Sequence, residues 1–156
     1  MGRRLYKMGV DKYAKGQSFE LEKKDRYYIN IALESLKTLK DYDIGRGGEF
    51  YFKVRRTTTQ RRRVPDRGEI RLMENQDFSP RQDFTLWTEF IELKQGDSKD
   101  LELDVALYER DIGVDDKIFK ETLQIRLGSE TDYKILENEN KSTKAKIRVS
   151  AGRTRY

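Results

Sequence analysis

The segment "LELDVALYERDIGVDDKIFKETLQIRL", residues 101–127, decides the fold class. Apolar residues take every second position from Leu101 to Leu107, and the run "FKETLQIRL" again places apolar residues two apart at its end. A period of two, with charged residues at the alternate positions, is typical of strands with one buried face. The polar, glycine-containing stretch between the two runs favours a turn. The segment therefore predicts two antiparallel strands joined by an acidic loop.

The same alternation recurs along the chain. It is clear in residues 27–36, 49–57 and 144–150, and weaker in 68–73, 84–94 and 131–137. In "FTLWTEFIELK" the apolar residues change parity, and a bulge near Thr88 would reconcile the two halves. Glycine- and aspartate-rich turns separate the runs, and no long amphipathic helix is visible. We therefore predict an all-β, eight-stranded antiparallel β-sandwich.

Composition excludes several kinds of chemistry. The 156 residues include no Cys and no His, which removes disulfides, thiolate and imidazole nucleophiles and the usual zinc ligands. Paired carboxylates and oxygen-ligated hard ions such as calcium remain. No run approaches the ~20 apolar residues that cross a bilayer. Residues 1–26 contain no continuous apolar segment, so we expect no secretory signal and a cytoplasmic protein.

The charges are segregated along the chain. Residues 53–67 contain seven basic residues against Asp66, whereas residues 97–116 contain eight acidic residues. Residues 141–156 contain six basic residues and no acidic one. This distribution predicts separate cation-attracting and anion-attracting surfaces.

Two loops concentrate carboxylates. One joins the strand that ends near Glu109 to the strand that begins near Asp116. The other is "DYDIGRGGE", residues 41–49. Calcium takes six to eight oxygen ligands, a number that two adjacent loops supply more readily than one. The alternative is that both loops are solvated turns, since Asp and Gly are ordinary turn residues.

The spacing of these acidic residues resembles that of a C2 domain, the calcium-dependent lipid-binding β-sandwich. Asp43 and Glu49 precede the aromatic strand "FYFKV", and Glu109, Asp111 and Asp116 precede "KIF". The resemblance spans residues 27–150, with 1–26 as a basic extension that could add an edge strand and 151–156 as a basic tail. It implies the second topology of the family, in which the last strand lies near the first, and a calcium ion held by these five residues. Two glutamates and a shorter third loop depart from the family pattern.

The resemblance also implies roles for apolar and basic residues. Ile44, Ile112 and Val114 would be membrane-facing loop tips, although such side chains alternatively pack beneath their own loops. The basic run would bind acidic lipid headgroups, and its candidate residues are Lys53, Arg55, Arg56, Arg61, Arg62 and Arg63. Guanidinium groups present planar donor forks that suit phosphate. The alternatives are a charged sheet face that deters edge pairing, or contact with RNA.

The function predicted from these observations is a non-enzymatic C2-like module that binds anionic phospholipid membrane, with calcium as a candidate cofactor. We expect peripheral membrane association. The alternative is a structural or assembly protein whose sandwich body and basic tails contact neighbouring subunits or nucleic acid. A carboxylate-dependent hydrolase is supported by nothing beyond the paired acids.

Overall fold

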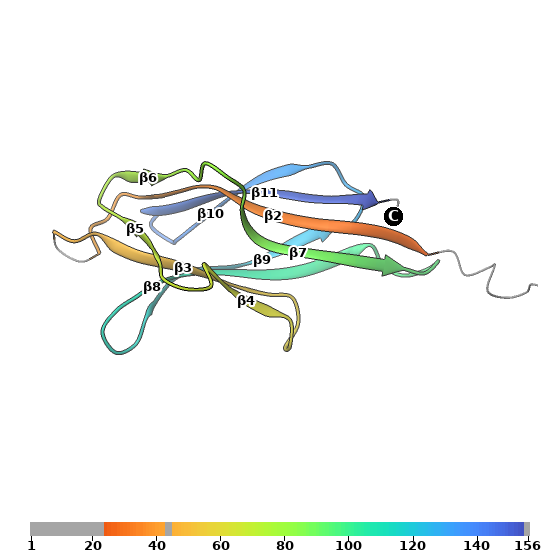
Figure 1. Cartoon of the computed structure of the whole chain (residues 1–156), viewed down its shortest axis with the longest axis horizontal. Helices are drawn as coiled ribbons and strands as arrows, with labels where there is room; N and C mark the ends of the chain where they lie inside the picture. Colours follow the sequence, from red (N-terminus) through yellow and green to blue (C-terminus); the bar gives the residue numbers. More distant parts are fainter. Residues whose placement is uncertain (1–23, 43–44, 155–156) are drawn as a thin grey trace, which may run out of the picture.

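The computed structural model describes residues 24–42 and 45–154, which form two antiparallel β-sheets packed face to face (Figure 1). One sheet contains β2 (Asp25–Thr38), β6 (Gln76–Phe78), β7 (Phe84–Leu93), β10 (Asp132–Glu137) and β11 (Thr143–Thr154). The other contains β3 (Gly48–Arg55), β4 (Arg61–Val64), β5 (Ile70–Leu72), β8 (Asp100–Glu109) and β9 (Asp116–Arg126). Over these same residues, no helix has the length and apolar character needed to cross a membrane.

The strand order brings the two ends of the described chain together. In the first sheet β2 lies between β11 on one side and both β6 and β7 on the other, and β10 flanks β11. In the second, β3 pairs with β4 and β5 along one edge and with β8 along the other, and β9 follows β8. The expectation that the last strand lies beside the first is confirmed, because β11 pairs with β2 from Thr143 to Thr154.

The predicted β-sandwich is confirmed, and the described part of the chain contains two short strands more than expected. All eight predicted runs are strands, and β4 and β6 are additional. The sequence "RRRV" of β4 shows no alternation because three of its four residues are arginines, and β6 has only three residues. The bulge is confirmed in β7, where Trp87 pairs with Ile31 and Thr85 with Ala32, so that Leu86 is the extra residue.

Part of the expected C-terminal tail is a strand in the structure. Residues 151–154 continue β11, and Ala151 is buried opposite Ile29. The pattern was obscured because Gly152 and Arg153 end the apolar alternation while the backbone pairing continues. Residues 1–23, most of the predicted basic extension, lie outside the described residues.

Apolar side chains from the inner faces of both sheets form one core. Phe50 and Phe52 of β3 and Ile29 and Ile31 of β2 have no exposed surface. Each fully buried side chain of this size contributes about 1.5–3 kcal/mol relative to an exposed one. The core therefore holds the two sheets together and defines where the loops at the ends of β3 and β8 begin.

Those loops meet at one end of the sandwich. The β2–β3 and β8–β9 connections extend from the same end in Figure 1. A cavity of about 1010 Å³ lies between them, and its lining includes Tyr42 and Gly47 from the first and Asp111 and Ile112 from the second. The predicted adjacency of the two acidic loops is confirmed for their described residues.

Candidate functional site

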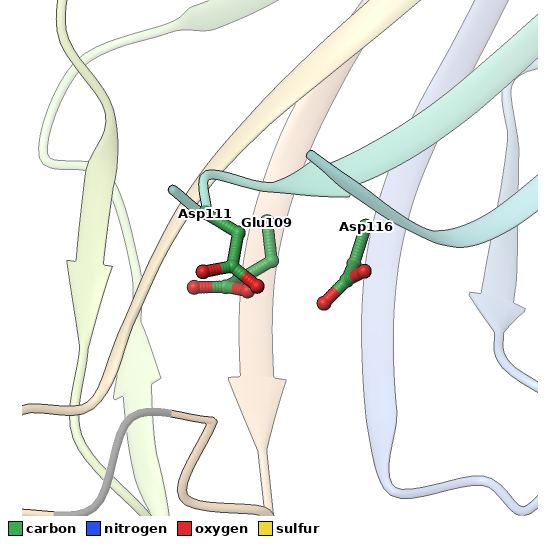
Figure 2. A group of neighbouring side chains, drawn as sticks. All are labelled: Glu109, Asp111 and Asp116. Carbon is green, nitrogen blue, oxygen red and sulfur yellow. The ribbon is translucent and has the colours of Figure 1, made fainter. Parts of the chain in front are cut away.

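Three carboxylates converge where β8 ends and β9 begins. Glu109 and Asp116 are cross-strand partners, and Asp111 lies in the loop between them. Oxygen atoms of the three side chains lie within 4.8 Å of one another, and Figure 2 shows Asp111 beside Glu109 with Asp116 facing both. Glu109 is only 2% exposed, whereas Asp111 and Asp116 are open to solvent. Three carboxylates at this spacing repel one another, so the arrangement favours a cation.

The donor set suits calcium. All three groups are carboxylates, which are the ligands that calcium and other hard divalent ions prefer. A calcium ion needs six to eight oxygens, so carbonyl groups or water would have to complete the shell. Glu109, Asp111 and Asp116 are the residues that would hold the ion.

Three of the five predicted metal ligands form this cluster. Asp43 lies outside the described residues. Glu49 is not among the three clustered carboxylates, and its carboxylate instead accepts a 2.7 Å hydrogen bond from Arg71 on the neighbouring strand β5. The reason is strand alternation: Phe50 pairs with the buried Glu109, so the adjacent Glu49 faces the opposite side of the sheet.

A separate aspartate holds the acidic loop in shape. Asp115 accepts a hydrogen bond from the Tyr51 hydroxyl with one carboxylate oxygen and a 3.0 Å bond from the Asp111 amide with the other. The Tyr51 hydroxyl and then the Asp111 amide keep the pKa of Asp115 below its ordinary value. Burial and the bond to Asp115 raise the pKa of Tyr51 to about 12. Asp115 therefore positions the loop and lies outside the carboxylate cluster.

The first loop is held similarly. The carboxylate of Asp41 accepts hydrogen bonds from the amides of Gly45 and Gly47, at 2.9 and 3.2 Å. Gly47 has a φ of 74°, and a Cβ there would lie 2.2 Å from the carbonyl oxygen of Leu72. Only glycine fits this close approach, which fixes where β3 begins.

The tip of the β8–β9 loop is apolar and exposed. Ile112 is 100% exposed and Val114 is 85% exposed. Neither side chain packs beneath its loop, so the alternative of a small satellite core is wrong for both. Ile44, the third predicted tip residue, lies outside the described residues. Two bare aliphatic side chains thus flank Gly113 beside three carboxylates.

A basic groove crosses the outer face of the second sheet. We use the term for the cavity of about 460 Å³ whose charged lining consists of Lys53, Arg55, Arg61, Arg62, Arg63, Asp104, Lys117 and Lys120. Ala106 and Tyr108 of β8 also line it. The cross-strand row Lys53–Ala106–Lys120 places a small residue between two lysines. Five of the six predicted anion-binding residues therefore share one cavity.

The remaining predicted anion-binding residue, Arg56, is directed elsewhere. Its Nε and Nη2 atoms bind the two carboxylate oxygens of Glu89 in the other sheet, at 3.1 and 3.3 Å. Trp87 donates to the same carboxylate. Arg56 therefore joins the two sheets, and its prediction as an anion-binding residue is not supported by its position.

Sequence reasoning missed Lys117 and Lys120. Both belong to β9, and they reach the groove because β9 pairs with β8, which pairs with β3. They lie outside the basic run, which ends at Arg67, so only the pairing order of the strands could have placed them beside it. Lys117 directly follows Asp116, so the groove begins beside the carboxylate cluster.

The groove also contains an internal anion. Asp104 lies 3.1 Å from Arg55 and 3.9 Å from Lys120 and accepts a 2.6 Å hydrogen bond from Thr122. The Thr122 bond and, after it, Arg55 and Lys120 keep the pKa of Asp104 below its ordinary value. Arg61 and Lys117 take part in no ion pair with the described residues. Lys53 also takes part in no ion pair among these residues, but its ammonium lies 4.8 Å from the centroid of the Tyr108 ring, so Arg61 and Lys117 are the groove cations most available to a ligand.

Comparisons with known proteins bear on the fold. No protein-family model and no curated protein sequence matches the chain. Among solved structures, human GIVD cytosolic phospholipase A2 matches with a TM-score of 0.57 and 12% identity, over 83% of this chain and 17% of that one. A C2 domain of plant Extended Synaptotagmin 1 matches with a TM-score of 0.51 and 11% identity, over 85% of this chain and 97% of that domain. The predicted resemblance is confirmed at the level of architecture: the chain has the fold of a C2 domain.

Proposed function

We propose that this chain is a non-enzymatic module that binds anionic phospholipid membrane through the end bearing the acidic loop, with calcium as cofactor. The observation that carries the proposal is the exposure of Ile112 and Val114 beside Glu109, Asp111 and Asp116. Moving an exposed aliphatic side chain out of water lowers the free energy of the system by about 0.8 kcal/mol for each buried CH₂ group. An end that presents both carboxylates and aliphatic tips suits a surface that is charged outside and apolar within.

The carboxylates alone would oppose this contact, since an anionic leaflet repels them. A bound calcium ion would neutralise their charge and offer coordination positions to lipid phosphate oxygens. Glu109, Asp111 and Asp116 would hold that ion at the base of the loop. Ile112 and Val114 would then enter the interface between headgroups and acyl chains.

The basic groove supports the same surface. It begins beside the acidic loop, where Lys117 follows Asp116, and extends across β8 to β4. Each basic side chain near an anionic leaflet contributes about 1 kcal/mol. Arg61 and Lys117 would therefore strengthen binding to headgroup phosphates without calcium.

Charge reversal in the groove tests this function. We expect Arg61→Glu combined with Lys117→Glu to weaken partition into vesicles of phosphatidylcholine and phosphatidylserine by at least about thirtyfold, because about 2 kcal/mol or more is lost. The control is Lys94→Glu with Lys99→Glu, in the β7–β8 connection at the opposite end of the sandwich. Equal vesicle binding by the two double variants would contradict a role for the groove.

A further inference from the structure

The outer face of the first sheet carries an aromatic pair that is open to solvent. Phe90 of β7 is 71% exposed and is the cross-strand partner of Tyr28 on β2, with ring centroids 4.7 Å apart. Both side chains point away from the core, because the neighbouring Tyr27 and Ile29 are buried on the inner face. Tyr28 in turn pairs with Gly152 of β11. One row across three strands that lie side by side in Figure 1 therefore reads Phe90, Tyr28, Gly152.

This row is bulky at one end and empty at the other. A Cβ atom added at Gly152 would meet no atom within 4 Å, and Gly152 is not among the residues with positive φ. The next row consists of the small uncharged residues Thr88, Asn30 and Ser150. The face therefore has a raised edge at Phe90 and a low, flat edge at Gly152, about 10 Å away across two strand spacings.

The row is complementary in shape to a second copy of itself. A two-fold axis that runs along the strands over Tyr28 would place the row on its own reverse. Phe90 of each copy would then lie over Gly152 of the other, and the two Tyr28 rings would meet at the axis. Such reciprocal contact is the property of an isologous interface, in which one patch serves both partners. Sheets that pack face to face keep their strands within about 30° of each other, which fits an axis of this direction.

The charges around the row also suit a second copy. Arg26 pairs with Glu92 at 2.7 Å. Arg148 contacts Glu34 at 3.2 Å and Asp83 at 3.6 Å. A copy of this face therefore meets ion pairs rather than an excess of one sign of charge. The outer face of the second sheet differs, since its basic groove would repel a copy of itself.

We propose that this face joins two copies of the chain in a symmetric dimer, with Phe90 of each copy seated over Gly152 of the other. The pairing itself does not depend on the proposed function. Its consequence for membrane binding does: because the axis runs along the strands, the acidic loops of both copies lie at the same end of the dimer. Two such ends can reach one membrane together, which raises the effective concentration of the second contact.

Sedimentation equilibrium of the full chain, without vesicles or calcium, tests the pairing. We expect the mean mass to rise from the 18.6 kDa of one chain toward twice that value as the protein concentration increases from about 1 µM to about 1 mM. Phe90→Ala should raise the dimer dissociation constant at least about tenfold, because it removes the aromatic anchor. Met73→Ala shortens a 42% exposed apolar side chain in the β5–β6 connection and is the control, which should leave the constant unchanged.

A steric variant separates loss of contact from loss of folding. In Gly152→Phe the new side chain has room within one copy, so the circular dichroism spectrum and the melting temperature should stay the same. It would collide with Phe90 of the other copy, so the dissociation constant should again rise at least about tenfold. Combining Gly152→Phe with Phe90→Ala exchanges the bulky and the small end of the row. This double variant should recover a dissociation constant within about threefold of that of the unaltered chain, because the two effects are not additive across a contact.

Three results would overturn the inference. A chain that stays monomeric up to about 1 mM would show that the face serves a different occupant. A dimer that both Phe90→Ala and Gly152→Phe leave intact would be held by another surface. A double variant that dimerises more weakly than either single variant would exclude the contact between Phe90 and Gly152. None of these results bears on the proposed function, which vesicle binding tests separately.

Discussion

The exposed tip of the acidic loop yields a prediction whose size follows from the structure. Ile112 is fully exposed, so Ile112→Ala removes no packing and should leave the free energy of unfolding within about 0.5 kcal/mol. The same change removes three carbon groups that would be buried in the membrane. At about 0.8 kcal/mol each, the loss is roughly 2.4 kcal/mol, which corresponds to about a fiftyfold weaker partition coefficient.

The assay is equilibrium partition into phosphatidylcholine–phosphatidylserine vesicles in the presence of calcium. Ile135→Ala is the matched control, since Ile135 is a half-exposed isoleucine on β10, in the first sheet, and undergoes the identical substitution. We expect vesicle affinity to fall only in Ile112→Ala. If both variants partition like the unaltered chain, the loop tip does not enter the bilayer and the proposed mode of contact is wrong.

Three further predictions concern ionisable groups. Calcium at a hundredfold excess over its dissociation constant should stabilise the fold by about 2.7 kcal/mol in thermal melts, and Asp111→Asn should erase most of that gain; a melting temperature indifferent to calcium would count against the cluster as a site. Because the pKa of Tyr51 is raised to about 12, its contribution to stability is present below pH ~10 and lost as pH rises toward 12, so Tyr51→Phe should flatten the alkaline decline seen in denaturant melts; an unchanged decline would mean that other groups cause it. Because the pKa of Asp104 is lowered, the contribution of Asp104 to the free energy of unfolding is present above pH ~4 and disappears as pH falls, so Asp104→Asn should lower stability near neutral pH and not in strong acid. The same variant should bind vesicles more tightly. Weaker binding would show that Asp104 organises the groove rather than competing with its ligand.

The fold was predictable from the sequence because strand alternation survives wherever one face is buried. The runs at 101–109 and 119–127 carry that signal plainly. β4 was not predictable, because arginine occupies the outward-facing positions 61 and 63 and also position 62, which has the same strand parity as the buried Val64. The C-terminal part of β11 was missed because backbone pairing continues past the last alternating apolar residue.

The site was only partly predictable, for a different reason. Glu109, Asp111 and Asp116 are close in sequence, so their convergence follows from a single hairpin loop. Glu49 was assigned by spacing alone, and spacing does not show that strand parity directs its carboxylate to Arg71. The role of Arg56 depends on Glu89, a partner far away in the sequence, which no local pattern reveals.

The central claim is that this chain binds anionic membrane with the help of calcium. Co-sedimentation of the full chain with vesicles tests it most directly, using phosphatidylcholine alone or mixed with phosphatidylserine, each with calcium and with a chelator. We expect strong sedimentation with phosphatidylserine and calcium, weaker sedimentation with phosphatidylserine and chelator through the basic groove, and little with phosphatidylcholine alone. A protein that stays in the supernatant under all four conditions would contradict the claim.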